Sequence, residues 1–189
     1  GRLNAYYNLD KESIRFTKAI TSGCSTLMSM SSQYTGRFSS ELYPDFNYIS
    51  KKGFDYPTYF DAFKKEGYEL NSMISEDGAG RQVFAHALNV FKTEPLSFYN
   101  AKDSYAEFVI MMEAKFNKNK PNFVFVHYGS FEDLDEYVQK TIQYIKDKNL
   151  YDDSIIIMSS DHGYVDYGNL HYLGWALQPR THSYYIDDN

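Results

Sequence analysis

The sequence predicts an α/β fold in which a mostly parallel sheet is flanked by helices. Residues 123–128 (FVFVHY) and 154–160 (SIIIMSS) are continuous apolar runs, as is typical of strands buried on both faces of a parallel sheet. Residues 134–150 lie between them and carry apolar side chains at helical spacing. The passage therefore has the strand–helix–strand order of a right-handed crossover unit.

Local signals predict the elements of the N-terminal part. Residues 8–13 predict a short helical turn, and residues 14–21 predict a strand that leads into a bend. A helix is expected over residues 25–34, because Ser and Thr are good N-caps and Gly36 stands just past its end.

The middle of the chain continues the alternation of helices and strands. Residues 56–68 have helical spacing and stop at Gly67, and residues 69–74 then predict a strand. Residues 75–103 are expected to hold loops and an irregular helix. Residues 104–117 predict a strong amphipathic helix.

Composition limits the class of protein. The 189 residues suffice for one domain with a sizeable core, so we expect residues 1–189 to form a single domain. The aromatic content of 18% argues against disorder, because Tyr and Phe bury large areas. A net charge of -6 without a basic stripe argues against a nucleic-acid partner. Cys24 is the single cysteine, which excludes an internal disulfide.

The first chemical candidate is SSDHG at residues 159–163. Asp161 and His162 directly follow an apolar run, where open parallel sheets place their ligands. A carboxylate and an imidazole suit Zn²⁺ or Mn²⁺ best, with Mg²⁺ and Ca²⁺ as alternatives. The competing interpretation is a turn in which Asp161 caps local amides and Gly163 takes a positive φ.

The second candidate is the hydroxyl-rich stretch at residues 23–36. Its hydroxyls crowd the start of the predicted helix, where free N–H groups and the helix dipole favour an anion. A Ser or Thr there can attack phosphorus or sulfur if a metal lowers its pKa. The competing interpretation is ordinary N-capping by Ser25 or Thr26 without catalysis.

Together these segments resemble the sulfatase family of the alkaline phosphatase superfamily. Residues 123–163 resemble the family segment that ends in S-D-H-G, and residues 7–36 resemble the family pattern that begins P-N-L-D and ends T-G. The matching positions of the second segment are Asn8, Leu9, Asp10, Phe16, Ala19, Ser29, Thr35 and Gly36. The position nine residues before Thr35 is Thr26, where the family places its nucleophile. The resemblance implies an alkaline-phosphatase-like sheet.

The resemblance also implies roles for single residues. Asp161 and His162 would bind the metal, and Thr26 would act as nucleophile and complete the coordination. His182 would be a catalytic residue, either as a ligand of a second metal or as a contact to a substrate oxygen. The remaining candidates are substrate contacts, namely Ser25, His127 and His171. For His127 a core histidine bonded to backbone is an equal alternative.

The chain departs from true sulfatases at the residue that they convert to formylglycine. Cys24 is followed by neither the Pro nor the Arg of that motif, which disfavours sulfate-ester hydrolysis. A threonine nucleophile is typical of relatives that act on phosphorus. The expected activity is therefore hydrolysis or transfer of phosphoesters or phosphodiesters. The alternatives are a sulfatase with a modified Cys24 and a non-catalytic member that retains the fold.

A second departure concerns the ends of the sequence. In the family, a strand upstream of the first motif carries an acidic metal ligand, and further sheet follows the last motif. We expect residues 1–189 to be a fragment that lacks both parts and is inactive by itself. The expected substrate is a small-molecule, lipid-linked or glycan-linked phosphoester, whereas the sequence leaves its identity, membrane association and the compartment open.

Overall fold

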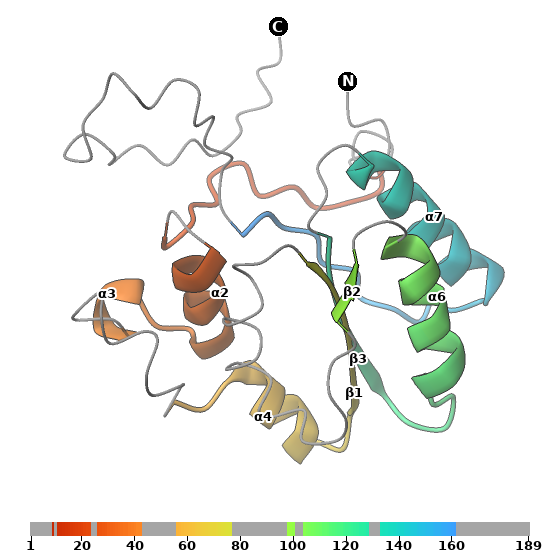
Figure 1. Ribbon diagram of the computed structural model, residues 1–189, viewed down its shortest axis with the longest axis horizontal. Helices are drawn as coiled ribbons and strands as arrows, with labels where there is room; N and C mark the ends of the chain where they lie inside the picture. The colour runs from red at the N-terminus through yellow and green to blue at the C-terminus, as the bar shows by residue number, and fades with distance from the viewer. Residues whose placement is uncertain are drawn as a thin grey trace, which may run out of the picture. The chain divides into compact units, whose positions relative to one another are not determined.

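The computed structural model describes residues 9, 11–23, 26–42, 56–76, 98–100, 104–128 and 133–161 (Figure 1). The chain forms two compact units, each made from two stretches of sequence. The first consists of Gly1–Thr17 with Tyr59–Ile157, and the second consists of Lys18–Thr58 with Met158–Asn189.

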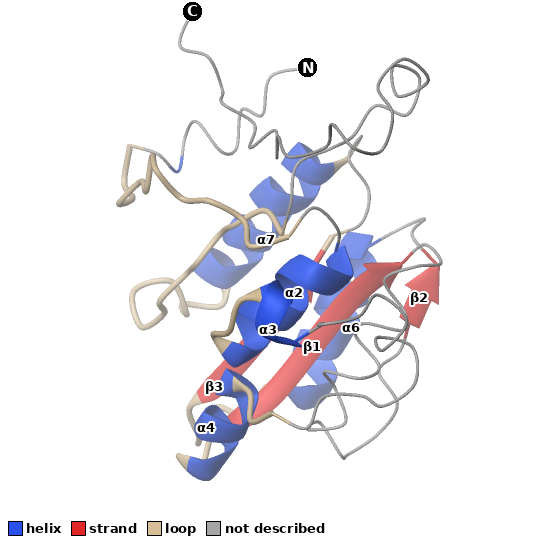
Figure 2. Cartoon of the chain, turned by 90° about the vertical axis from the view of Figure 1, so that its left-hand side faces the viewer, coloured by secondary structure: helices blue, strands red, loops and turns tan. Residues whose placement is uncertain are grey.

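The first unit is built on a parallel three-stranded sheet, counted over the described residues. Strand β1 (Glu69–Glu76) lies in the centre, between β2 (Phe98–Asn100) and β3 (Asn122–His127) (Figure 2). Ile74 of β1 is opposite Phe98 on one side and opposite His127 on the other. The strands predicted over residues 69–74 and 123–128 are thus present as β1 and β3 and pair in parallel, whereas β2 lies in a stretch where loops and an irregular helix were expected.

Alternating side chains of β3 face two different layers of helices. Phe123 and Phe125 meet Phe60 of α4 (Tyr59–Lys65) edge to face, with ring centroids 5.7 and 6.0 Å apart. Val124 and Val126 instead pack against the buried cluster centred on α6 (Ser104–Lys115). This period of two is what a strand covered on both faces requires.

The core of this unit lies between the sheet and α6, with α7 (Leu134–Asp147) beside it. Met73, Phe108 and Met112 are its buried members. The ring of Tyr144 on α7 meets that of Phe108 edge to face at 5.4 Å. Figure 1 shows α6 and α7 together on one side of the sheet and α4 on the other. The helices predicted over residues 104–117 and 134–150 are thus confirmed, each with an earlier end.

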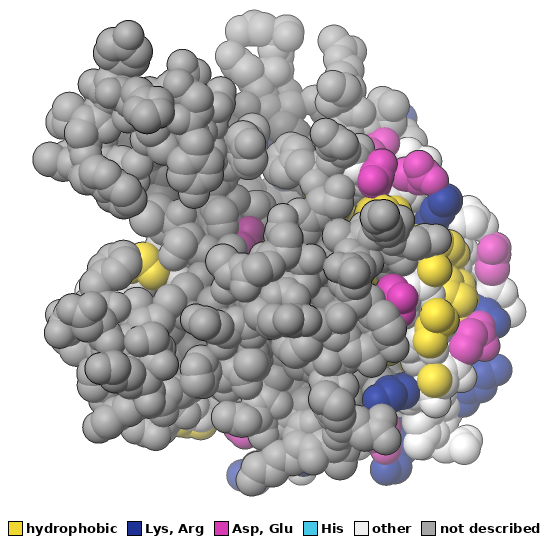
Figure 3. All heavy atoms as spheres, in the orientation of Figure 1, with side chains coloured by type: hydrophobic (Ala, Val, Ile, Leu, Met, Phe, Trp, Pro, Cys, Tyr) yellow, Lys and Arg dark blue, Asp and Glu magenta, His cyan; other side chains and the backbone are white. Residues whose placement is uncertain are grey.

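The outer face of α6 and α7 mixes charged and apolar side chains (Figure 3). Lys148 Nζ lies 2.6 Å from Glu113 Oε1, which also accepts a hydrogen bond from the Tyr144 hydroxyl at 2.8 Å. The hydrogen bond from Lys148 lowers the pKa of the Glu113 carboxyl, and that from Tyr144 adds to it. Because these groups are exposed, the pair contributes little to stability.

Helices α4 and α7 end in the same way. Gly67 has φ 82°, and the N–H of Tyr68 donates to the Phe63 carbonyl at 3.1 Å. Asn149 has φ 55° and is followed by the corresponding bond, which makes both ends Schellman motifs. The stop predicted at Gly67 is confirmed. Among the described helices, none is long and apolar enough to cross a membrane.

The second unit contains α2 (Thr26–Thr35) and α3 (Ser39–Leu42). Met30, Tyr34 and Leu42 are its buried large side chains. Gly36 ends α2 with φ 67°, and its N–H donates to the Ser32 carbonyl at 2.8 Å. The helix predicted over residues 25–34 is confirmed with a shift of one residue at each end.

Two predicted strands are wrong. Residues 14–21 and 154–160 carry no strand structure, and Ile14, Ile155 and Ile157 are 86%, 93% and 85% exposed. A strand needs a neighbour that supplies ladder hydrogen bonds, and no described strand pairs with residues 14–21 or 154–160. The predicted crossover unit therefore lacks its second strand in the described part of the chain. Strand β2, with three residues, is too short for periodicity to reveal.

Candidate active site at the start of helix α2

The backbone carbonyl of Asp161 is held at the first turn of α2 by two hydroxyl groups. Thr21 Oγ1 donates to this oxygen at 2.7 Å, and Ser29 Oγ donates to it as well. All three residues belong to the second unit. Residues 21–29 and the segment that ends at Asp161 thus lie together although they are far apart in the sequence. Asp161 directly precedes His162.

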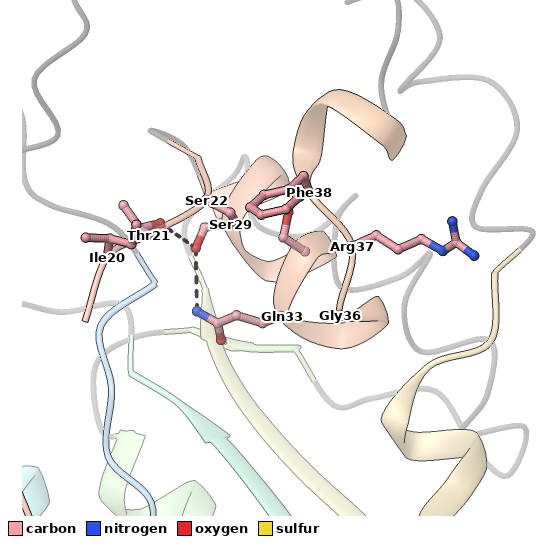
Figure 4. Close-up of a pocket in the computed structure, with 9 residues that line it drawn as sticks. Ile20, Thr21, Ser22, Ser29, Gln33, Gly36, Arg37 and Phe38 are labelled. Atoms are coloured by element: carbon pink, nitrogen blue, oxygen red, sulfur yellow. Dashed lines mark hydrogen bonds between the residues drawn. The ribbon is translucent and has the colours of Figure 1, made fainter. Parts of the chain in front are cut away.

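The two hydroxyls belong to a longer hydrogen-bonded chain (Figure 4). Gln33 Nε2 donates to Ser29 Oγ at 3.5 Å, and the Gly23 N–H donates to Thr21 Oγ1 at 3.4 Å. The Thr21 and Ser29 oxygens are 2.9 Å apart. Since a hydroxyl has one proton, Thr21 donates to one acceptor at a time, and the Asp161 carbonyl is nearer to it than the Gly23 carbonyl or Ser29 Oγ, which both lie at 2.9 Å. The chain links one face of α2 to the segment that carries the predicted metal ligand.

Gly23 permits the close approach of the preceding segment to α2. A Cβ on this buried residue would lie 2.4 Å from Met28 Cβ and 3.0 Å from the Ser29 backbone nitrogen. Distances this short exclude any larger side chain without a shift of the helix. A glycine here therefore lets Thr21 reach Ser29. Sequence reasoning missed Thr21 and Gly23, although a glycine shortly before a predicted helix was a usable signal.

The backbone of Thr26 opens α2, three positions before Ser29. Residues three apart share a helix face, so Thr26 stands on the face that binds Asp161. The first turn of a helix leaves N–H groups without helical partners, and these favour an anion. The structure therefore brings Asp161 to the end of α2 at which the predicted nucleophile stands. Chemically, this arrangement suits transfer of an anionic group.

Of the other predicted site residues, the structure describes His127 alone. His127 is the last residue of β3, is half-buried, and belongs to the first unit. The remaining four positions, including the metal ligand of the S-D-H-G motif, lie outside the described residues. They are Ser25, His162, His171 and His182.

The donors that the structure describes fit a divalent cation in kind and fall short in number. Asp161 provides an anionic oxygen, which Zn²⁺, Mn²⁺, Mg²⁺ and Ca²⁺ all accept. Within the described ranges, no group of three or more His, Cys, Asp or Glu residues could hold a metal. A metal site at Asp161 would therefore need further ligands beyond these described donors.

Comparisons with known proteins add no relative. No family model, curated protein or solved structure matches this chain. The resemblance to the sulfatase family therefore rests on the residues quoted above. What the site does is inferred from those residues and from the contacts of Asp161.

Proposed function

We propose that this chain is part of a metal-dependent hydrolase or transferase that acts on phosphoesters through Thr26. The supporting observation is the hydrogen bonding of the Asp161 carbonyl to Thr21 and Ser29. Metal-assisted attack requires a nucleophile beside a metal ligand. The contacts of Asp161 keep its segment at the end of α2 where Thr26 stands.

In this proposal a divalent metal would be held by Asp161, His162, Thr26 and an acidic residue of an upstream strand, and it would supply the positive charge that lowers the pKa of the threonine hydroxyl. Thr26 Oγ1 attacks phosphorus as the bond to the leaving alcohol breaks, which leaves a phosphothreonine. Water, or the hydroxyl of an acceptor in a transferase, then attacks this phosphothreonine and restores Thr26. The N–H groups of the first turn of α2 stabilise the transferring group. His182 contacts a substrate oxygen or the leaving group.

The alkaline-phosphatase-like architecture belongs to the same proposal. The parallel order β2-β1-β3, with helices on both faces, supports an α/β fold of that general kind. It does not distinguish this superfamily from other α/β folds, because many functions share such sheets. The chemistry therefore needs a direct test.

The test measures hydrolysis of bis(4-nitrophenyl) phosphate by the full-length natural protein, with Mn²⁺ or Zn²⁺ and after their removal by a chelator. We expect metal-dependent turnover that falls at least about 10³-fold in Thr26→Ala, because the nucleophile is lost. Mass spectrometry of the peptide that contains Thr26 should find phosphothreonine in the quenched wild type.

Thr35→Ala is the matched control. This residue is a threonine of the same helix whose hydroxyl donates to the Ser31 carbonyl at 2.8 Å, at the opposite end from Thr26. Its loss should leave turnover unchanged. Full activity of Thr26→Ala refutes the assignment of the nucleophile. Formylglycine at Cys24 would establish a sulfatase, and absence of metal-dependent turnover would establish a non-catalytic protein.

A further inference from the structure

We propose that Thr21 and Ser29 are positioning residues that set the affinity of the proposed site for its metal. Their hydroxyls hold the backbone of Asp161 in place before a metal binds. This inference rests on the proposed function, because it takes Asp161 as a metal ligand. Both hydrogen bonds end on the Asp161 carbonyl oxygen, so they do not use the carboxylate oxygens that a metal would bind.

The Asp161 carbonyl is anchored from two segments of the chain. Thr21 Oγ1 donates to it at 2.7 Å from the segment before α2, and Ser29 Oγ donates to it from the helix. A carbonyl oxygen has two lone pairs, so it accepts both bonds. Donors on two segments restrict the movement of the Asp161 backbone more than one donor does.

The two donors have fixed positions of their own. Ser29 is 0% exposed within α2, so packing holds its side chain in place. Thr21 belongs to a segment that lies against the helix at Gly23, where a Cβ would come within 2.4 Å of Met28 Cβ. Figure 4 shows the hydroxyls of Thr21 and Ser29 pointing toward each other, with their oxygens 2.9 Å apart. These two groups are therefore suited to fix a less ordered neighbour.

The segment that leads to Asp161 lies outside the regular structure. Residues 158–160, which precede it in the second unit, are exposed and belong to no helix or strand. Without the two hydroxyl bonds, this segment has to be ordered when the metal binds, and the lost entropy weakens binding. At saturating metal concentration Asp161 is fixed by its own coordination, so the chemical step is largely unaffected.

The inference therefore separates metal affinity from turnover. Removal of either hydroxyl should weaken metal binding and leave most of the turnover at saturating metal. A role in folding alone would instead lower the Tm and leave the metal affinity unchanged. Loss of groups that orient metal ligands typically costs about 10–100-fold in metal affinity, which is large enough to measure.

The experiment titrates Mn²⁺ into the metal-free full-length natural protein and measures free Mn²⁺ by electron paramagnetic resonance, at a temperature well below the Tm of each variant. We expect Thr21→Val and Ser29→Ala each to raise the Kd for Mn²⁺ about tenfold, and the double variant about 100-fold. With bis(4-nitrophenyl) phosphate at saturating Mn²⁺, kcat should fall about threefold or less. Thr21→Ser, which keeps the hydroxyl, should retain the wild-type Kd.

Two control variants remove similar hydroxyls elsewhere on α2. Thr35→Val makes the same change as Thr21→Val, in a threonine whose hydroxyl donates to the Ser31 carbonyl at 2.8 Å. Ser32→Ala removes the hydroxyl of a buried serine, as Ser29→Ala does, but Ser32 Oγ has no hydrogen-bond partner among the described residues. Both controls should bind Mn²⁺ with wild-type affinity.

Two results would overturn the proposal. The first is a Kd for Mn²⁺ that stays within about twofold of the wild-type value in folded Thr21→Val and Ser29→Ala. The second is an equal rise of the Kd in Thr35→Val, which would indicate a general loss of stability. If Ser29→Ala does not fold, Thr21→Val decides, because Thr21 is only half-buried.

Failure of this inference can be distinguished from failure of the proposed function. If the wild type binds Mn²⁺ and hydrolyses the substrate while the variants keep its Kd, the positioning role alone is refuted. If the wild type does not bind Mn²⁺, the metal site is refuted and the positioning role with it.

Discussion

Thr21 Oγ1 donates a hydrogen bond of 2.7 Å to the carbonyl oxygen of Asp161, 140 positions farther along the chain. Ser29 donates to the same oxygen from α2. One backbone acceptor thus joins the segment before α2, the helix itself and the segment that leads into His162. This shared acceptor has consequences for stability that differ from those of two separate hydrogen bonds.

The effects of removing the Thr21 and Ser29 hydroxyls on the free energy of unfolding should not be additive. Thr21→Val and Ser29→Ala should each lower the free energy of unfolding by about 1 kcal/mol, because each leaves the carbonyl one donor. The double variant leaves it none, so we expect a loss that exceeds the sum by about 0.5 kcal/mol or more. Urea unfolding measures all three. Ser40→Ala, at an exposed position of α3, is the control, and strict additivity would contradict the shared acceptor.

Gly23 and Gly36 require glycine for two different reasons, namely close packing and a positive φ. Their alanine variants allow the stability effects of these two reasons to be compared. Gly23→Ala places a Cβ 2.4 Å from Met28 Cβ, so we expect a loss of about 1–3 kcal/mol from overpacking. Gly36→Ala meets no atom within 4 Å and suffers only from its φ of 67°, at about 1 kcal/mol. Denaturation midpoints compare the variants. A larger loss at Gly36 than at Gly23 would contradict the close approach at α2.

Sequence periodicity was sufficient where many residues repeat the same signal. Helices α6 and α7 and strand β3 were predicted because long amphipathic or apolar runs average over local exceptions. The run at 154–160 indicated a tendency to be buried and contained no information about which neighbour would bury it. The contact between Thr21 and Asp161 had no signal at all, because a bond to a backbone carbonyl leaves no pattern in the acceptor residue. Helix α2 was predictable, whereas the contacts that bring Asp161 to it were not.

Tyr128 should make the protein less stable in strong alkali. Burial raises the pKa of its hydroxyl from 10.0 to about 12, although the hydrogen bond with Thr141 opposes part of this. Above pH 10 the unfolded chain loses a proton that the folded chain keeps, so stability falls as pH rises from about 10 to 12. Between pH 9 and pH 11, the free energy of unfolding of Tyr128→Phe should therefore fall by roughly 1.4 kcal/mol less than that of the wild type. Urea unfolding at both values tests this, and equal losses would contradict it.

Ile155 and Ile157 should tolerate charge. Because they are 93% and 85% exposed, Ile155→Lys and Ile157→Lys should change the free energy of unfolding by less than about 0.5 kcal/mol. Light scattering should show less aggregation, because the uncharged run at 154–160 is interrupted. Met73→Lys, at a residue 3% exposed, is the control and should unfold the protein. Strong destabilisation by the isoleucine variants would instead support the buried strand that the sequence predicts.

The central position of β1 affects how the chain acquires its sheet during synthesis. The ribosome releases Glu69–Glu76 before either partner strand, so both edges of β1 at first lack a strand to pair with. The three-residue β2 arrives next and covers only one end. The long edge is covered when Asn122–His127 emerges, and pairing between segments so distant is slow. Nascent chains that have not reached β3 therefore expose an unpaired strand edge, and they are the species that chaperones would have to protect.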